Sequence, residues 1–490
     1  MLPDLTGSEP TPRLESCERS CALAFSSTCR LLRWQIAPWI FDHLYNWNRG
    51  TQNVWPKSLW SYPTKLEIRD RSVRHPAQLL VNHSLALAIE SMQHLRTVTI
   101  RLETAIPTYL LVALSNCRAL ADLTLQQARL DGEDVPTQLV FPALETLIIR
   151  FGGIWGVLRD PAAPHDVAQE HRNVHRLLHM VSPRLKHLTL SGDYISLSFT
   201  EVIWTQLVSF TVTEHPPRPH ITVPDLIVNM PYLRTLELCF TPNNAVQEYP
   251  PFRTGWQGHN WPPNLTSLSL SNVDWHEDSI FAAIPGGLKQ LRLLAEHDLY
   301  DRTAPHRPNI GFQLLEEYPV KGFGLLTVLP RIPDLSALTS LSVTLGEDTP
   351  SSDLLYAIEN KCPSLRDLQV RYVASERWRL LYTIDLDKLD TRSLFFLAFR
   401  KFQHLTHVTF FIVDHPFDHI LGAPAHSAYR LLSEAPRLQL VTYKFGGYYN
   451  LGSFAPVVYA WDRALLDGPP PPRSIRHSSA RLIVVPMPVA

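Results

Sequence analysis

The stretch Ser182–Leu190 reads Ser-Pro-Arg-Leu-Lys-His-Leu-Thr-Leu, and the rest of the chain repeats its pattern. A leucine follows the proline by two residues, and apolar residues stand three and five positions after that leucine. The same offset between proline and leucine occurs at Pro142, Pro183, Pro231, Pro263, Pro363 and Pro436. Further copies keep the three apolar positions without the proline, with first leucines at Leu95, Leu120, Leu207, Leu288, Leu338 and Leu405.

The pattern predicts a short strand followed by a return connection. The last residues of each copy alternate between apolar and polar, which is typical of a strand with one buried face. The proline ends any preceding helix, because it lacks an N–H and disfavours helical geometry in the residue before it. Successive first leucines lie between 22 residues (Leu185 to Leu207) and 50 residues (Leu288 to Leu338) apart. The longer spacings indicate repeats that carry insertions.

These copies resemble the leucine-rich repeats of the irregular, helix-containing kind, over residues 61–445. The resemblance implies an α/β solenoid with a curved parallel sheet inside and helices outside, whose function is protein binding. Amphipathic segments between the copies predict the outer helices, at residues 106–117, 167–181, 225–229, 352–361 and 427–434.

Composition narrows the class of protein. The chain has 490 residues, 45% of them hydrophobic, and a net charge of −1, so charge gives no reason to expect nucleic acid or an anionic membrane as partner. The 6 cysteines show no disulfide framework, which favours a reducing compartment. No apolar run is long enough to span a membrane, so we expect a cytoplasmic or nuclear protein.

A second resemblance lies ahead of the repeats. Residues 20–34 read Ser-Cys-Ala-Leu-Ala-Phe-Ser-Ser-Thr-Cys-Arg-Leu-Leu-Arg-Trp, and residues 37–44 read Ala-Pro-Trp-Ile-Phe-Asp-His-Leu. Together they resemble the C-terminal half of a fungal-type F-box. The resemblance implies a partial helical cap at residues 17–60, with Lys65–Arg69 as the edge strand that begins the array. It also implies the substrate-recognition subunit of a cullin-based (SCF-type) ubiquitin ligase. Its adaptor protein would contact Leu23, Phe25, Leu31, Leu32 and Trp34.

The first residues depart from the F-box pattern. Met1–Leu5 imitates its Leu-Pro-x-Asp opening, but Gly7, Pro10 and Pro12 interrupt the helix that should follow. We therefore expect residues 1–16 to be poorly ordered, with the first F-box helix missing or the gene model truncated. Two alternatives stay open: a non-catalytic repeat scaffold with a decayed F-box and no ligase role, and a generic helical cap on the solenoid.

The polar strand positions should line the concave face of the solenoid. Threonine and serine dominate them, which the β-propensity of threonine explains without any binding role. Arginine is enriched at binding hot spots, so Arg101, Arg150, Arg292 and Arg371 are the candidates for contact with an unknown protein target. Insertions at residues 151–166, 240–261, 295–330, 372–400 and 411–425 should gather along one rim, either as a second binding region or merely packed on themselves.

No catalytic or cofactor motif is present, so we expect neither an enzyme nor a cofactor. His171, His175 and His179 share one face of a predicted helix, but this spacing alone does not predict a metal site. Residues 446–490 predict a closing cap and a tail that contains the proline run of Asp467–Arg473, and Arg481–Ala490 either folds back as an extended strand or stays loose.

Overall fold

The computed structural model describes residues 42–47, 60–69, 83–102, 105–126, 128–150, 166–214, 217, 221–240, 261–271, 279–294, 324–345, 352–372, 398–413, 428, 431–446, 457–463 and 481–482. The chain divides into two compact units, Met1–Thr235 with Pro262–Asn264, and Leu236–Trp261 with Leu265–Ala490. The predicted adaptor contacts from Leu23 to Trp34, residues 1–16 and most of the five insertions lie outside the described residues.

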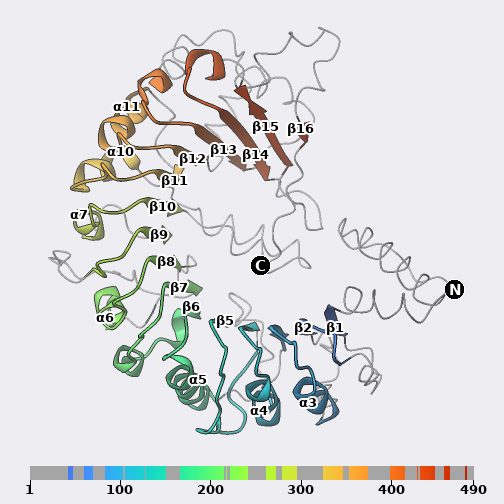
Figure 1. Cartoon of the computed structure of the whole chain (residues 1–490). Helices are drawn as coiled ribbons and strands as arrows, with labels where there is room; N and C mark the ends of the chain where they lie inside the picture. The colour runs from blue at the N-terminus through green and yellow to red at the C-terminus, as the bar shows by residue number, and fades with distance from the viewer. Residues whose placement is uncertain are drawn as a thin grey trace, which may run out of the picture. The chain divides into compact units, whose positions relative to one another are not determined.

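The strands of the first unit follow one another in chain order and pair in parallel (Figure 1). Within the described residues they are β1 His43–Trp47, β2 Lys65–Arg69, β3 Thr97–Arg101, β4 Asp122–Gln126, β5 Thr146–Arg150, β6 His187–Ser191 and β7 Ser209–Glu214. Two apolar positions of each central strand face the core in register. Val98 of β3, for example, lies opposite Leu66 and Leu123 of the strands beside it, and all three are almost completely buried. Each fully buried leucine stabilises the fold by about 1.5–3 kcal/mol.

The expectation that Lys65–Arg69 is the edge strand is wrong. β1 pairs in parallel with β2 along its whole length, with His43 opposite Lys65 and Trp47 opposite Arg69. The array therefore begins one strand earlier, inside the segment that the F-box resemblance assigns to a helical cap. His43–Trp47 lacks the leading leucine of the repeat pattern, and polar Asn46 stands at the position opposite the buried Ile68, so the pattern did not reveal this strand.

The proline of the motif occupies a tight turn just before each strand. In Met230–Leu233 the N–H of Leu233 donates to the carbonyl oxygen of Met230 over 3.1 Å, so Pro231 is the second residue of the turn. Proline suits that position because its φ is already fixed at the value that the turn requires. The next residue, Arg234, donates its N–H to the carbonyl of Val208 over 2.8 Å and thereby joins the turns before β7 and β8 (Thr235–Phe240).

Helices cover one face of the sheet in the first unit. They are α3 His83–Glu90, α4 Thr108–Asn116, α5 Val167–Val181 and α6 Val223–Ile227. Figure 1 shows α3 and α4 side by side outside β2 to β4. The predictions at 106–117 and 167–181 are confirmed. The prediction at 225–229 is confirmed with a shift, since α6 begins two residues earlier and ends two residues earlier.

The connection between β6 and β7 contains two 3₁₀ turns in place of a helix, η3 Gly192–Tyr194 and η4 Leu197–Glu201. Aromatic side chains fill the space that a helix would occupy. The ring of Phe199 lies 5.4 Å from that of Trp204 and 5.6 Å from that of Phe210, centroid to centroid. All three rings are buried, so this short connection completes its layer of the core with aromatic volume.

The second unit repeats the same plan. Its parallel strands, among the described residues, are β8 Thr235–Phe240, β9 Ser267–Ser271, β10 Gln290–Leu294, β11 Ser340–Leu345, β12 Asp367–Tyr372, β13 His407–Val413 and β14 Leu440–Gly446. The outer elements are α7 Ile280–Ala283, α10 Leu325–Val328, η5 Leu329–Arg331, α11 Ser352–Lys361 and η6 Phe399–Lys401. The helix predicted at 352–361 is confirmed, and residues 428 and 431–434 of the one predicted at 427–434 are helical.

One prediction for the second unit needs correction. α10 lies inside the insertion predicted at 295–330, where a four-residue helical turn is too short to show periodicity. At the other end of the unit two further strands close the sheet, and the second of them agrees with the extended alternative predicted for Arg481–Ala490. β15 Val457–Asp462 pairs antiparallel with β14, and β16 Arg481–Leu482 pairs antiparallel with β15.

Candidate protein-interaction face

The first, third and fifth residues of each strand point away from the apolar core, and parallel register lines them up in rows across the sheet. In the first unit one such row consists of Arg101 in β3, Gln126 in β4 and Arg150 in β5. We call these three residues the arginine row. The sequence places each of them at the end of its strand, and the register brings them together.

The arginine row presents two guanidinium groups with an amide between them. Neighbouring strands lie about 4.8 Å apart, so the Cα atoms of Arg101 and Arg150 are separated by roughly 10 Å. All three residues are partly exposed. Guanidinium groups bind carboxylates and phosphates in a forked geometry, and an amide can both donate and accept hydrogen bonds. The row therefore suits an extended, acidic ligand.

Arg101 already has one acidic neighbour. Its Nε lies 3.4 Å from Oε1 of Glu67 in β2, and the two side chains are 31% and 9% exposed. Glu67 is buried and stands on the same face of the sheet, so this ion pair orients Arg101. Sequence analysis missed Glu67, because nothing in its spacing reveals that it lies beside a residue 34 positions later.

Arg150, unlike Arg101, forms no ion pair within the part of the chain that the structure describes. Its Nε is buried and, like the Nε of Arg101, makes no hydrogen bond there. A buried donor without a partner costs about 1–3 kcal/mol, so an incoming acceptor would gain by satisfying it. Arg150 therefore combines partial exposure and an unsatisfied donor with a charge that no acidic side chain among the described residues pairs.

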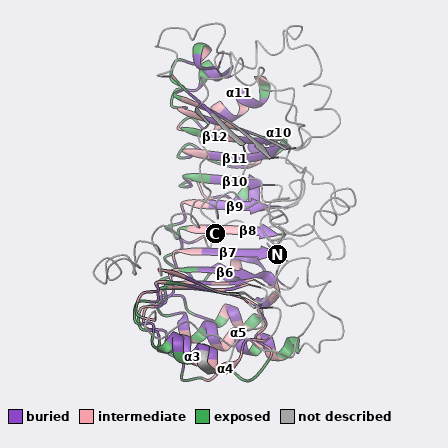
Figure 2. Cartoon of the chain, turned by 90° about the vertical axis from the view of Figure 1, so that its right-hand side faces the viewer, coloured by how far each residue is buried: buried purple, intermediate pink, exposed green. Residues whose placement is uncertain are grey.

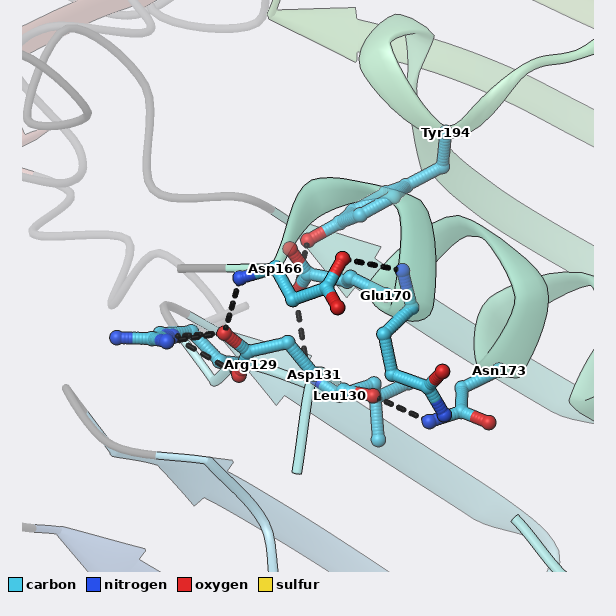
Figure 3. A network of polar contacts seen from close by, with 8 residues as sticks. Arg129, Leu130, Asp131, Asp166, Glu170, Asn173 and Tyr194 are labelled. Atoms are coloured by element: carbon cyan, nitrogen blue, oxygen red, sulfur yellow. Dashed lines mark hydrogen bonds and ion pairs between the residues drawn. The ribbon is translucent and has the colours of Figure 1, made fainter. Parts of the chain in front are cut away.

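A network of polar contacts holds the connection that leads into β5 (Figure 3). This connection, residues 128–145, contains no helix, so its backbone groups need partners from elsewhere. Asn173 of α5 supplies three of them: its Nδ2 donates to the carbonyls of Leu130 (2.7 Å) and Glu133 (2.9 Å), and its Oδ1 accepts from the N–H of Val135 (3.0 Å).

Glu170, one turn earlier on α5, supplies the next contact. Its Oε1 accepts from the N–H of Leu130 at 3.0 Å and from the hydroxyl of Tyr194 at 3.2 Å. Both Glu170 and Asn173 are buried, at 1% and 0% exposure. Figure 3 shows the two side chains reaching from α5 to the same short segment around Leu130. The network thus fixes the backbone that precedes the strand carrying Arg150.

The start of α5 extends this network. Asp166 caps the helix by accepting from the N–H of Gln169 at 2.9 Å, and its own N–H donates to Asp131 at 3.2 Å. Asp131 also forms an ion pair with Arg129, seen at the left of Figure 3. The negative charge of Asp166 at the N-terminus of α5 is stabilised by the helix dipole as well as by the hydrogen bond from Gln169.

Arg292 lies in the second unit and is paired. Its guanidinium lies 3.5 Å from Oε1 of Glu237, and the two side chains are 46% and 29% exposed. Ser269 stands between these residues in the strand order and is itself buried. Because Arg292 is well exposed, the pair adds at most about 1 kcal/mol to stability.

Arg371 is not exposed as the sequence analysis expected. Only 9% of its surface is accessible, and Thr344, opposite it in β11, is fully buried. Figure 2 shows the same trend along β10 and β11, where burial increases toward the end of each strand. In this part of the second unit burial extends to the polar positions of the strands, so Arg371 presents little surface to a ligand.

The histidines of α5 do not assemble a metal site. Nε2 of His175 lies 2.9 Å from the carbonyl of Ser198, and its ring packs against that of His179 at 4.3 Å. Burial and the neighbouring His175 lower the pKa of His179. Among the described residues no cluster of three or more histidine, cysteine or acidic side chains could hold a metal ion.

Comparisons with known proteins show no family for this chain. No family model matches the chain, and no curated protein matches it. Among solved structures, the chain is similar to one described as the crystal structure of the Rad7 and Elc1 complex in yeast, with 15% identity over 74% of this chain and 75% of that chain and a TM-score of 0.34. At this identity and TM-score the similarity carries no argument about function. None of the helices in the described ranges is long and apolar enough to cross a membrane.

Proposed function

We propose that the chain is a protein-interaction module whose arginine row binds an acidic segment of a target protein. The observation that carries this proposal is the placement of Arg101 and Arg150 in one register row, with an unpaired buried Nε on Arg150. Arginine is the residue best suited to planar, two-bonded recognition of carboxylates, and a parallel sheet holds its side chains at fixed spacing.

The finer proposal is that the module serves as the substrate-recognition subunit of an SCF-type ubiquitin ligase. Its support is the resemblance of residues 20–44 to the second half of an F-box, followed by repeats. In this proposal Leu23, Phe25, Leu31, Leu32 and Trp34 contact the adaptor, while the repeat array holds the target. Arg292, paired with Glu237, and the buried Arg371 have secondary roles at most.

The adaptor proposal is tested by co-precipitation of the full chain with the purified SCF adaptor protein. We expect capture by the wild type and loss of capture by the double variant Leu31→Glu/Leu32→Glu. A truncation at Leu66 is a poor control, because it removes β1 and exposes the edge of β2. The variant Arg150→Ala is the matched control and should still bind the adaptor.

The target-binding proposal has its own test. Fluorescence anisotropy would measure how a labelled peptide of ten glutamates binds to the full chain at low salt. We expect Arg101→Ala/Arg150→Ala to weaken binding about tenfold, because two charge-assisted contacts are lost. Arg118→Ala removes an exposed arginine outside the row and should leave binding within about twofold of the wild type. An equal loss of affinity in Arg118→Ala would contradict the proposal, because the arginines of the row would then contribute only nonspecific positive charge.

The second candidate function is a repeat scaffold without a ligase role. The interruption of the first F-box helix by Gly7, Pro10 and Pro12 favours it. Failure of the wild type to capture the adaptor, together with normal binding of the acidic peptide, would establish this alternative and leave the arginine row intact.

A further inference from the structure

Basic residues collect where the chain turns into the parallel strands of the second unit. Five such turns, each with the last residues of the element before it, are residues 284–289, 331–339, 361–366, 400–406 and 434–439. Their acidic residues are Asp334 and Glu434, and their basic residues are Lys289, Arg331, Lys361, Arg366, Arg400, Lys401 and Arg437. The whole chain is almost neutral, with 45 basic and 46 acidic residues, so this excess is local. We call these basic residues the basic rim.

Backbone hydrogen bonds hold the turns of the basic rim in one stack. The N–H of Thr339 donates to the carbonyl of Lys289, and the N–H of Arg366 donates to that of Thr339, each over 2.9 Å. The hydroxyl of Thr339 donates to the same Lys289 carbonyl at 3.1 Å. Neighbouring strands lie about 4.8 Å apart, so the backbones of Lys289 and Arg366 are separated by roughly 10 Å. The charges therefore start from a rigid base at fixed intervals.

Several cations of the basic rim lack an acidic partner. Lys289, Arg366 and Lys401 are exposed, and within the described residues their side chains make no hydrogen bond or ion pair. Arg437 is also exposed, and its guanidinium donates to the carbonyl of Gln403, which is uncharged. These side chains can therefore contact an incoming anion without first giving up an ion pair.

The carboxylates nearest to the basic rim in the sequence already have partners. Glu434 forms an ion pair with Arg400. Asp334 accepts a hydrogen bond of 2.8 Å from the backbone N–H two residues later. Asp367, the first residue of β12, lies 3.2 Å from Nδ1 of His407 in the next strand. The basic rim therefore keeps a net positive charge, and its complement is an anionic partner.

Helix stabilisation explains only part of the basic rim. Lys361 lies in the last turn of α11, where a cation opposes the helix dipole. That effect fades within the last turn, whereas Arg366 stands beyond the end of the helix. Lys289 follows α7, whose four residues form little more than one turn. Solubility would be served by charges of either sign, so it does not explain an excess of one sign.

The basic rim suits an acidic polypeptide better than nucleic acid. Domains that bind nucleic acid through charge are usually strongly basic, whereas this chain has a net charge of −1. Single-stranded nucleic acid also stacks its bases on accessible aromatic rings, and the aromatic residue within these turns, Phe402, is buried. An extended polypeptide advances about 3.3 Å per residue, so acids three positions apart match the interval between Lys289 and Arg366.

We infer that the basic rim binds an extended acidic segment of a partner protein, in which carboxylates about three residues apart pair with Lys289 and Arg366. This surface is separate from the arginine row, which lies in the first unit and at the last residues of its strands. The inference therefore does not depend on the function proposed above.

The test is fluorescence anisotropy of the full chain with a labelled peptide that carries glutamate at every third position among glycine and serine. Salt of about 0.1 M screens charges more than roughly 10 Å apart. Lys289→Glu/Arg366→Glu should weaken binding about tenfold or more, because two attractive contacts become repulsive. Arg118→Glu/Arg172→Glu changes the net charge equally at two exposed arginines of the first unit, and should alter binding less than about twofold.

The same measurements in the Arg101→Ala/Arg150→Ala background separate this inference from the proposed function. We expect Lys289→Glu/Arg366→Glu to weaken binding there by the same factor. A peptide that responds only to the arginine-row variant would support the proposed function and reject the basic rim as a binding surface.

Two further results would overturn the inference. One is binding of duplex DNA, but not of the peptide, that Lys289→Glu/Arg366→Glu abolishes, since the occupant would then be nucleic acid. The other is self-association of the chain in sedimentation that the same variant abolishes, since the occupant would then be a second copy. Thermal unfolding of each variant checks that a loss of binding is not a loss of fold.

Discussion

Single polar residues inside the fold decide where its irregular connections lie. The connection at residues 128–145 contains no helix to satisfy its backbone groups. The side chain of Asn173 forms hydrogen bonds with three of them. The sequence predicted the apolar stripe of α5 at Val174, Leu177, Leu178 and Val181, all of them buried. It could not predict what Asn173 binds, because its partners are backbone groups about 40 residues away.

Replacing Asn173 by leucine keeps most of the volume and removes all three bonds. The carbonyls of Leu130 and Glu133 and the N–H of Val135 would lose these partners, so we expect a loss of about 2–4 kcal/mol in the free energy of unfolding. Urea denaturation followed by circular dichroism would measure it. Arg172→Ala, an exposed neighbour on the same helix, should change stability by no more than about 0.5 kcal/mol. Similar losses in both variants would show that α5 tolerates no substitution there, and that the network is not the cause.

Buried cysteines should be chemically inert in the folded chain. Burial raises the pKa of Cys117 and of Cys362 to about 12. At pH 8 only about one thiol in ten thousand is then a thiolate, and the thiolate is the reactive form. We expect neither residue to be alkylated by iodoacetamide until the protein is unfolded in urea, as mass spectrometry of the digested chain would show. Rapid labelling of Cys117 in buffer alone would mean that α4 opens readily.

The strands were more predictable than the segments that join them. Every copy of the leucine pattern from Leu95 to Leu438 corresponds to a strand from β3 to β14, because register and burial act on the same two alternating positions. α3, α7 and α10 were missed. α7 and α10 span only four residues each, which is too short for a helical period, and tertiary packing rather than sequence pattern makes them helical.

The connection between β6 and β7 tests whether aromatic volume substitutes for a helix. Phe199→Ala should cost about 3–5 kcal/mol, because the rings of Trp204 and Phe210 would face a cavity. Leu197→Ala in the same 3₁₀ turn is the control, since Leu197 is 60% exposed and should contribute less than about 0.5 kcal/mol. Chemical denaturation would measure the free energy of unfolding of both variants. A small effect of Phe199→Ala would mean that the turn collapses into the space and that the cluster is not essential.

At the scale of the whole molecule, the parallel strands contact mainly their neighbours in the sequence. Destabilisation should therefore spread over a few strands and then fade. The candidate interaction face is local in the same sense, because the register between neighbouring strands decides which residues share a row. The sequence named the arginines but could not tell the partly exposed pair in the first unit from the buried Arg371, because burial depends on what covers a strand and not on the strand itself.

Hydrogen exchange of a core variant would measure this spread. Leu368 of β12 is almost completely buried, and Leu368→Ala should destabilise its surroundings by about 2–5 kcal/mol. We expect faster exchange in β11, β12 and β13, and unchanged protection in α3 and α4. Mass spectrometry of the exchanged peptides would show where along the chain the exchange rate changes. Uniform acceleration across the chain would instead indicate a single cooperative unit.

The antiparallel pairing of β15 with β14 has a consequence for how such an array can change in evolution. A gene duplication that copies one strand and its return connection adds a strand that continues the parallel order of the array. Behind β14 that place is taken by a strand running the opposite way. New repeats can therefore be accommodated upstream of β14, whereas a copy inserted after it would have to displace β15, so lineages should vary in repeat number within the array and keep its closing hairpin constant.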